Sequence, residues 1–306
     1  MSFQLTILGS SGALPAYGRF PSSQYLNIHK HHILIDCGEG IQTQLKRFSI
    51  PTQKIDKIFI SHLHGDHYLG LMGLLFSMHL NRRTNDLHLY SQPGLDQIII
   101  LQLKYSKSAL NYKLIFHPIP NGESVCLYED KSLTVRTIPL KHKVPCTGFL
   151  FKEKEKSRRI DKDKLPENMM LAYIAQLKLG KDVFDEEGTL LYKNTDYTLP
   201  PRPSRSFAYC SDTAYDENLA KQIKEVDLLY HEATFMQEHA DKAAMTLHST
   251  TLQAAKIASL AKVKCLLIGH YSARYRELDA LQAEAATVFK NTKLAIEGET
   301  IDLDQL

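Results

Sequence analysis

Several hallmarks of secreted and membrane-spanning proteins are missing from this sequence. The five cysteines stand singly, without a Cys-x-x-Cys pair (Cys37, Cys126, Cys146, Cys210 and Cys265). This pattern argues against a disulfide framework and a thiolate zinc site, so we expect buried free thiols. No apolar run reaches the roughly 18 to 20 residues that span a bilayer, and the opening Met1-Ser-Phe-Gln lacks a signal-peptide core. We therefore expect a cytoplasmic protein with no membrane partner.

A strong excess of charge of one sign is also absent. The formal net charge of +3 is too small by itself to indicate a nucleic-acid-binding protein. Charge is concentrated, however, between Lys152 and Lys164, where seven basic residues occur against four acidic ones. The basic residues are Lys152, Lys154, Lys156, Arg158, Arg159, Lys162 and Lys164. The segment is either a solvated, salt-bridged loop or an arm that faces phosphates.

The 306 residues, 43% of them hydrophobic, suffice for one large domain or two modest ones. Short β-prone runs occur at Phe3–Leu8, His31–Ile35, Lys57–Ile60, Leu87–Tyr90, Leu133–Ile138, Ser206–Cys210, Asp227–His231 and Lys264–Ile268. Helical patterns occur between several of them, at Gly40–Phe48, Tyr68–Leu80, Thr250–Ala261 and Leu278–Phe289. Such mixing predicts an α/β fold in which helices cover sheets.

Two further patterns divide the chain. Thr250 and Gln253 form a capping-box pattern, which predicts a helix start at that point. From about residue 151 to 205 the apolar periodicity fades and charge rises, until Pro200-Pro-Arg-Pro203 closes the stretch. We expect this stretch to be an insertion that projects from a single main domain.

The residues most informative about chemistry are Ser61-His-Leu-His-Gly-Asp-His67. Three imidazoles and one carboxylate within six positions predict a metal site, with a chance surface cluster as the alternative. An apolar strand precedes them and an apolar helix follows, so the cluster should lie on a strand-to-helix loop. Imidazole favours zinc and related metals, and the added carboxylate suggests an open, catalytic centre rather than a closed structural one.

A metal pair needs more ligands than this loop supplies. Three further candidates, His142, Asp212 and His270, each follow a β-prone run, where a side chain enters a cleft rather than a core. Taken singly, each is better explained as a hydrogen-bonded structural residue. Together with His62, His64, Asp66 and His67 they complete a set of seven donors.

With these motifs the chain resembles the metallo-β-lactamase superfamily and, within it, the ribonuclease Z family of tRNA 3′-processing endonucleases. The resemblance covers nearly the whole chain. Besides the septet it rests on Leu34-Ile-Asp-Cys-Gly-Glu-Gly40, Ser211-Asp-Thr213, His231-Glu-Ala-Thr-Phe235, Leu247-His-Ser-Thr250 and Gly269-His-Tyr-Ser-Ala-Arg-Tyr275. It implies an αββα sandwich of two mixed sheets flanked by helices, with the insertion at 151–205 as a protruding, tRNA-binding arm.

The resemblance also implies roles for individual residues. His62, His64 and His142 would hold one zinc ion, Asp66, His67 and His270 a second, and Asp212 would bridge the two. Asp66 would in addition accept a proton, and His248 would be the general acid, held by Glu232. Ser272 and Arg274 would contact phosphate, and Lys152, Lys154, Lys156, Arg158 and Arg159 the tRNA backbone. Asp36 would orient the metal-binding loop without touching metal.

The function expected from this resemblance is zinc-dependent removal of the 3′ trailer from precursor tRNA by a homodimer with two zinc ions per subunit, leaving a 3′-hydroxyl. One alternative keeps the metal pair but has a small phosphodiester or another ester as substrate. Another is a metal-bound RNA-binding protein without turnover. Cleavage of precursor tRNA, compared with bis(p-nitrophenyl) phosphate, separates these possibilities.

Overall fold

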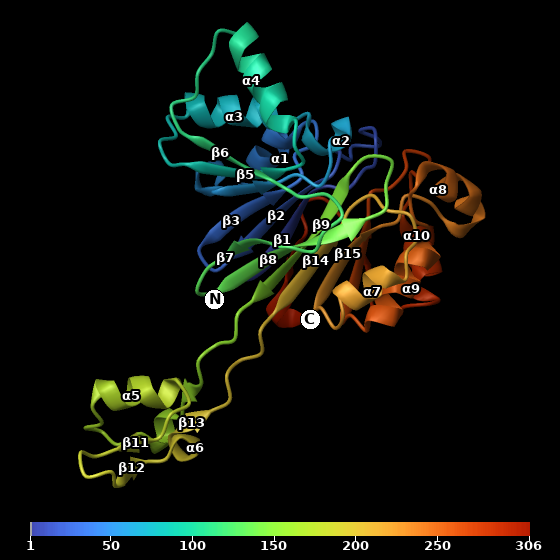
Figure 1. Cartoon of the computed structure of the whole chain (residues 1–306). Helices are drawn as coiled ribbons and strands as arrows, with labels where there is room; N and C mark the ends of the chain where they lie inside the picture. The colour runs from blue at the N-terminus through green and yellow to red at the C-terminus, as the bar shows by residue number, and fades with distance from the viewer. Residues whose placement is uncertain (1) are drawn as a thin grey trace. The chain divides into compact units, whose positions relative to one another are not determined.

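The computed structural model describes residues 2–306 and divides them into two compact units (Figure 1). The larger unit contains the described residues up to Tyr128, together with Val135–Phe151 and Arg205–Leu306. The smaller unit contains Glu129–Thr134 and Lys152–Ser204. Within residues 2–306, no helix combines the length and the hydrophobicity that crossing a membrane requires.

Two seven-stranded sheets form the larger unit. The first sheet has the strand order β18-β1-β2-β3-β4-β5-β6. These strands are β1 (Phe3–Gly9), β2 (Ser23–Ile28), β3 (His31–Ile35), β4 (Lys57–Phe59), β5 (Leu87–Ser91), β6 (Leu114–Pro118) and β18 (Thr300–Asp302). The pairs from β3 to β6 are parallel and those from β18 to β3 are antiparallel, so the sheet is mixed.

The second sheet has the order β17-β16-β15-β14-β9-β8-β7. Its strands are β7 (Cys126–Glu129), β8 (Leu133–Leu140), β9 (Cys146–Glu153), β14 (Ser206–Cys210), β15 (Leu228–Glu232), β16 (Cys265–Gly269) and β17 (Thr292–Leu294). Strands β14 to β17 are parallel. The carboxyl ends of β14, β15 and β16 therefore meet at one edge of the sheet, which is where ligand sites form in such sheets.

Aromatic side chains fill the space between the two sheets. Phe59 lies edge-on to Phe149 and Phe151, with ring centroids 5.2 and 5.6 Å apart, and Phe151 stacks on Phe207. All four side chains are fully buried. Burying a Phe side chain stabilises a fold by about 1.5–3 kcal/mol, so this layer fixes the two sheets against each other.

Helices cover the outer face of each sheet and complete an αββα sandwich (Figure 1). Over the first sheet lie α1 (Ile41–Arg47), α3 (Leu71–Leu80) and α4 (Leu95–Tyr105). Over the second lie α7 (Asn218–Gln222), α9 (Thr251–Ala261) and α10 (Asp279–Ala286). The short α2 (Gly65–Tyr68) and α8 (Ala240–Thr246) belong to loops. Short 3₁₀ helices lie at Thr52–Lys54, Lys162–Lys164, Gln237–His239 and Leu303–Gln305.

The smaller unit has its own small core. Two strand pairs form it, β10 (Arg159–Ile160) with β13 (Thr198–Leu199) and β11 (Val183–Phe184) with β12 (Leu190–Tyr192), together with helices α5 (Leu171–Lys178) and α6 (Asn194–Tyr197). Its buried apolar side chains are Met169, Leu177 and Val183, and partly buried tyrosines pack around them.

The structure confirms the α/β prediction and the capping box at Thr250, where Thr250 and Gln253 exchange both hydrogen bonds. The helix predicted for Tyr68–Leu80 is confirmed as α3 from Leu71 to Leu80, but it begins three residues later than predicted, because the chain turns between α2 and α3. Gly70 lies at this break against Gly38, whose carbonyl oxygen a Cβ on Gly70 would approach to 2.1 Å. The expectation of buried thiols is wrong for Cys126, which is exposed.

Candidate metal centre and active site

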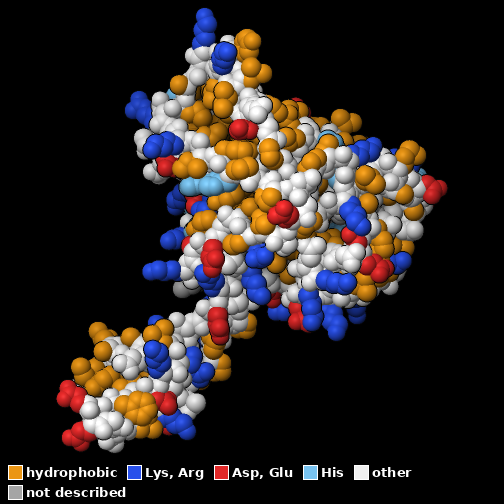
Figure 2. Space-filling view, in the orientation of Figure 1, with side chains coloured by type: hydrophobic (Ala, Val, Ile, Leu, Met, Phe, Trp, Pro, Cys, Tyr) orange, Lys and Arg blue, Asp and Glu red, His pale blue; other side chains and the backbone are white. Residues whose placement is uncertain are grey.

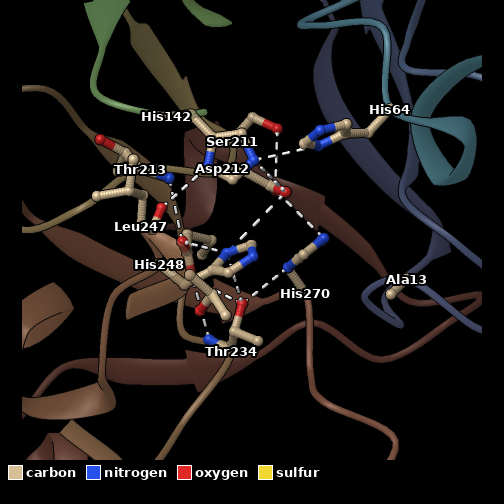
Figure 3. A network of polar contacts seen from close by, with 12 residues as sticks. Ala13, His64, His142, Ser211, Asp212, Thr213, Thr234, Leu247, His248 and His270 are labelled. Atoms are coloured by element: carbon tan, nitrogen blue, oxygen red, sulfur yellow. Dashed lines mark hydrogen bonds and ion pairs between the residues drawn. The ribbon is translucent and has the colours of Figure 1, made fainter. Parts of the chain in front are cut away.

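The seven predicted donors converge at the edge where both sheets end. His62, His64, Asp66 and His67 lie on the loop and the short helix after β4. His142 follows β8, Asp212 follows β14 and His270 follows β16, as their sequence positions predicted. Figure 3 shows His64, His142, Asp212 and His270 pointing toward one another from separate segments.

Three imidazoles form the first part of the cluster. His64 Nδ1 lies 3.0 Å from His62 Nε2 and 3.1 Å from His142 Nε2. Asp212 Oδ2 lies 3.6 and 3.7 Å from the same two Nε2 atoms. Two nitrogen ligands of one tetrahedral zinc ion lie about 3.3 Å apart, so these four atoms have the spacing of a metal-binding set.

The second part contains Asp66, His67 and His270. Asp66 Oδ2 lies 3.4 Å from His67 Nε2 and 3.3 Å from His270 Nε2. Asp212 Oδ1 lies 3.4 and 3.2 Å from these nitrogens. The two oxygens of Asp212 therefore face different groups of donor atoms.

His67 provides a test of whether this set fits a metal. Its Nδ1 donates to Asp36 Oδ2 at 2.8 Å, so in the neutral imidazole Nε2 carries the lone pair. Within residues 2–306 this buried Nε2 has no hydrogen-bond partner. An unsatisfied buried acceptor is costly, whereas a ligand imidazole has this arrangement when its other nitrogen is held by a carboxylate. The donor set therefore fits a metal ion.

Asp36 organises this side of the centre and is fully buried at the end of β3. Besides His67 it accepts hydrogen bonds from Ser61 N (2.7 Å), Ser61 Oγ (2.9 Å) and Tyr209 Oη (2.6 Å).

Three residues around the centre adopt the left-handed backbone conformation. They are Asp36, Leu247 and His270, with φ of 56°, 57° and 60°. The Leu247 carbonyl accepts from His142 Nδ1 at 3.0 Å and so directs His142 Nε2 toward the centre.

The pKa values of the donor histidines shift in different directions. Burial alone would lower the pKa of His67, but the carboxylates of Asp212, Asp36 and Asp66 outweigh it and raise that pKa. Burial lowers the pKa of His62, His64 and His142, so these imidazoles are neutral, as metal ligands must be. Burial alone would raise the pKa of Asp66 and of Asp212. The neighbouring imidazoles His67 and His270 outweigh that effect and lower both values, so both carboxylates are ionised.

His248 lies beside this cluster and is paired with Glu232. His248 Nδ1 donates to Glu232 Oε1 at 2.9 Å, and the imidazole stacks on His270 with centroids 5.4 Å apart. Burial alone would lower the pKa of His248, but the Glu232 carboxylate outweighs it and raises the pKa to about 9. His248 Nδ1 is thus occupied, and Nε2 remains available for proton transfer.

Ser272 and Arg274 follow His270 on the same loop. Arg274 Nε donates to Ser272 Oγ at 3.2 Å, and the Arg274 guanidinium lies 5.1 Å over the Phe235 ring. The Phe235 ring in turn lies edge-on to the His248 ring, with centroids 6.2 Å apart. Beside His64 and Asp66, a cleft of about 380 Å³ is lined by Pro21, Glu39 and Leu69 as well. The cleft thus opens beside two of the seven donors.

The predicted arm residues belong to the smaller unit, where several make internal contacts. Lys154 pairs with Glu129 and Lys156 with Glu153, each at 2.6 Å. Arg158 Nε donates to Thr198 Oγ1, and Arg159 Nε to the Pro200 carbonyl. Lys152 is exposed. Four of these five basic side chains thus make contacts within the unit, and Lys154 joins its two chain segments, in agreement with the salt-bridged alternative.

Sequence reasoning missed two residues of the site. Tyr209 holds Asp36, and Thr234 contacts Glu232, His248 and His270 at once. Thr234 stands two residues after Glu232, within the His231–Phe235 motif that supports the family resemblance. The sequence does not reveal the contacts of Thr234, because His248 and His270 lie 14 and 36 positions further along the chain.

Comparison with known proteins gives full-length relatives. The chain is 49% identical over 300 residues to a protein named ribonuclease Z from Cytophaga hutchinsonii, covering 98% of this chain and 96% of the relative. It is 44% identical to ribonuclease Z from Bacteroides fragilis, covering 98% of this chain and 99% of the relative. The chain belongs to the ribonuclease Z family. The prediction of this family from sequence is confirmed.

Solved structures place the ribonuclease Z family fold among metallo-β-lactamase proteins. The short form of human tRNase Z superposes with a TM-score of 0.72 at 26% identity, covering 98% of this chain and 99% of that one. The metallo-β-lactamase fold protein YhfI from Bacillus subtilis superposes with a TM-score of 0.69 at 19% identity, covering 99% and 100%. The family model described as anti-Pycsar protein Apyc1 also matches, at residues 3–179, so the chain belongs to that family too. The predicted metallo-β-lactamase fold is confirmed.

Proposed function

We propose that this member of the ribonuclease Z family is a metal-dependent endoribonuclease that removes the 3′ trailer of precursor tRNA and leaves a 3′-hydroxyl on the tRNA. One observation carries the proposal. A seven-residue donor set divided by Asp212 lies next to the His248–Glu232 pair, so the chain has both metal ligands and a separate proton donor. Because precursor tRNA is the substrate, we propose a cytoplasmic location.

The donor atoms fit two zinc ions per subunit. His62, His64 and His142 would hold one ion, Asp66, His67 and His270 the other, and Asp212 would face both. When bound, such a pair supplies an activated water and neutralises charge on the phosphate.

The chain's own residues supply the remaining chemistry. Asp66 Oδ2 faces His67 and His270 and accepts a hydrogen bond from Ala13 N at 2.8 Å, so the carboxylate is fixed in position. Its other oxygen is the proposed proton acceptor. His248 can donate a proton to the departing ribose oxygen because Glu232 holds its other nitrogen. Arg274, positioned on Phe235, can contact phosphate oxygens.

The smaller unit is proposed as a tRNA-binding exosite. Its charged stem includes Lys152, Lys154, Lys156, Arg158 and Arg159. Its surface also exposes large apolar side chains, with Leu171 at 82% and Phe184 at 53% exposure. Figure 2 shows charged and hydrophobic side chains interspersed over this unit. Such a mixed surface suits the phosphates and sugars of a folded RNA.

We further propose that the protein is a homodimer in which α4 contacts the second copy. Ile100, Leu101 and Tyr105 on this helix are 63, 55 and 78% exposed, and hydrophobic side chains gather over the α3–α4 region in Figure 2. Exposed apolar clusters of this kind mark interaction surfaces. Leu101→Glu should lower the sedimentation mass to that of a monomer, whereas Leu260→Glu, at a similarly exposed site on α9, should leave it unchanged.

The proposed function is tested with purified protein on two substrates. Precursor tRNA should be cleaved once, 3′ of the discriminator nucleotide, with a far higher kcat/KM than bis(p-nitrophenyl) phosphate. A preference for the small substrate would favour a general phosphodiesterase. Metal binding without cleavage of either substrate would favour a non-catalytic RNA-binding protein.

A further inference from the structure

Thr234 lies between the metal centre and the proton donor. Its side chain is almost fully buried, and its hydroxyl oxygen contacts three functional groups. These are Glu232 Oε2 at 2.7 Å, His270 Nδ1 at 2.8 Å and His248 Nδ1 at 3.3 Å (Figure 3). The proposed metal ligands and the proposed proton donor do not include Thr234.

The direction of each hydrogen bond follows from the chemistry of Glu232. The buried carboxylate accepts at Oε1 from Thr213 N, Ser249 N and His248 Nδ1. It accepts at Oε2 from Thr234 N at 3.0 Å and from the Thr234 hydroxyl. An ionised carboxylate has no proton to give, so the hydroxyl proton of Thr234 must point at Glu232.

The direction of this hydrogen bond determines which ring nitrogen of His270 carries the hydrogen. With its proton given to Glu232, the Thr234 oxygen has only lone pairs left for His270 Nδ1. His270 Nδ1 must then carry the hydrogen and donate it. His270 Nε2 is left as a lone pair facing Asp66 and Asp212, at 3.3 and 3.2 Å, which is the side of the metal ligands.

The same carboxylate fixes His248 through its other oxygen. Glu232 therefore orients two side chains. It orients the proposed proton donor His248 directly, and it orients the proposed metal ligand His270 through Thr234. We propose that Thr234 is a positioning residue that fixes the metal-binding tautomer of His270 and couples it to His248 through Glu232. This inference rests on the metal-binding and acid roles proposed above.

Replacing the hydroxyl is the direct test. Thr234→Val keeps the branched shape but leaves His270 Nδ1–H without an acceptor, and lost support of a ligand imidazole typically lowers metal affinity about 10- to 100-fold. Thr234→Ser keeps the hydroxyl and should restore the affinity. Thr147→Val serves as the matched control, because Thr147 is a buried threonine whose hydroxyl accepts from Gln92 and contacts no histidine.

Zinc and cobalt binding are measured by competition with a chromophoric chelator, in the absence of RNA. We expect Thr234→Val to weaken one of two binding constants about 10- to 100-fold and to change the visible spectrum of the cobalt form. Thr234→Ser and Thr147→Val should resemble the unmodified protein. Equal affinity in the Val and Ser variants, or equal weakening in both, would overturn the role of the hydroxyl.

The coupling to His248 has its own readout. With saturating zinc, Thr234→Val should still cleave precursor tRNA about 10-fold more slowly, and its effect should largely vanish in a His248→Ala background. Fully additive effects would overturn the coupling. Because metal binding is measured without substrate, an unmodified protein that binds zinc but does not cleave precursor tRNA would count against the proposed function alone.

Discussion

The metal centre and the smaller unit hold their functional side chains in different ways. At the centre, Glu232 accepts five hydrogen bonds and Asp36 four, all in buried surroundings. In the smaller unit, Lys154 has a single ion pair with a partner that is more than half exposed. The centre is thus preorganised for one geometry, as catalysis requires, whereas the surface of the smaller unit can adapt to a flexible partner.

The strongest test of the preorganised region removes the shared carboxylate. Asp212→Ala should abolish binding of at least one metal and lower cleavage of both substrates by about 10³-fold or more, because several kcal/mol of charge stabilisation are lost. Elemental analysis and rate measurements check this. Two full metal equivalents with normal cleavage would exclude Asp212 as a bridging ligand.

A second test separates proton transfer from metal binding. His248→Ala should retain its metals and lose roughly 10²- to 10⁴-fold in cleavage of precursor tRNA, since the ribose oxygen leaves poorly without a proton. Hydrolysis of bis(p-nitrophenyl) phosphate should suffer much less, because p-nitrophenolate leaves unaided. His79→Ala, near the end of α3 and in none of the donor groups, is the control. Equal losses on both substrates would contradict the acid role.

The contrast between the two regions predicts that the smaller unit can be removed without loss of phosphodiester hydrolysis. Arg159 and Leu199 are paired across β10 and β13, so a short Gly-Ser bridge can replace residues 157–201. We expect the KM for precursor tRNA to rise on the order of 10- to 100-fold, about 1.4–2.8 kcal/mol of binding, with a weaker salt dependence. Hydrolysis of the small substrate should persist. A parallel loss on both substrates would mean that this unit also supports the active site.

The smallest expected effect is a local loss of stability. Leu177 is fully buried in the three-residue core of the smaller unit, so Leu177→Ala should destabilise that unit by about 2–4 kcal/mol. Amide exchange should accelerate within residues 152–204 and stay unchanged in the β14–β16 region. Leu171→Ala, on the exposed side of the same helix, should have no measurable effect. Faster exchange at the centre would show that the two units unfold together.

The sequence was sufficient for eight strands of the two sheets and for the grouping of the seven predicted donors, because β-prone runs and clustered imidazoles carry strong local signals. It was not sufficient for α4, which buries Leu95 and Ile99 but leaves the apolar side chains of Ile98, Ile100 and Leu101 exposed. The break at Gly70 depends on contact with Gly38, which no local pattern reveals. Glu232 and His248 were predicted through the family resemblance, and Thr234 required the three-dimensional meeting of two distant loops.

The left-handed backbone at Asp36, Leu247 and His270 implies a conflict between stability and activity. Each such residue costs roughly 1–2 kcal/mol relative to ordinary helical or extended backbone, and glycine would avoid that cost. At His270 glycine would remove the imidazole that we propose as a metal ligand, so the proposed activity requires that cost. At Leu247 the contact with His142 uses the backbone carbonyl, so glycine could preserve it. Selection for heat resistance alone would therefore be expected to change Leu247 first, and to reach His270 only when activity is no longer required.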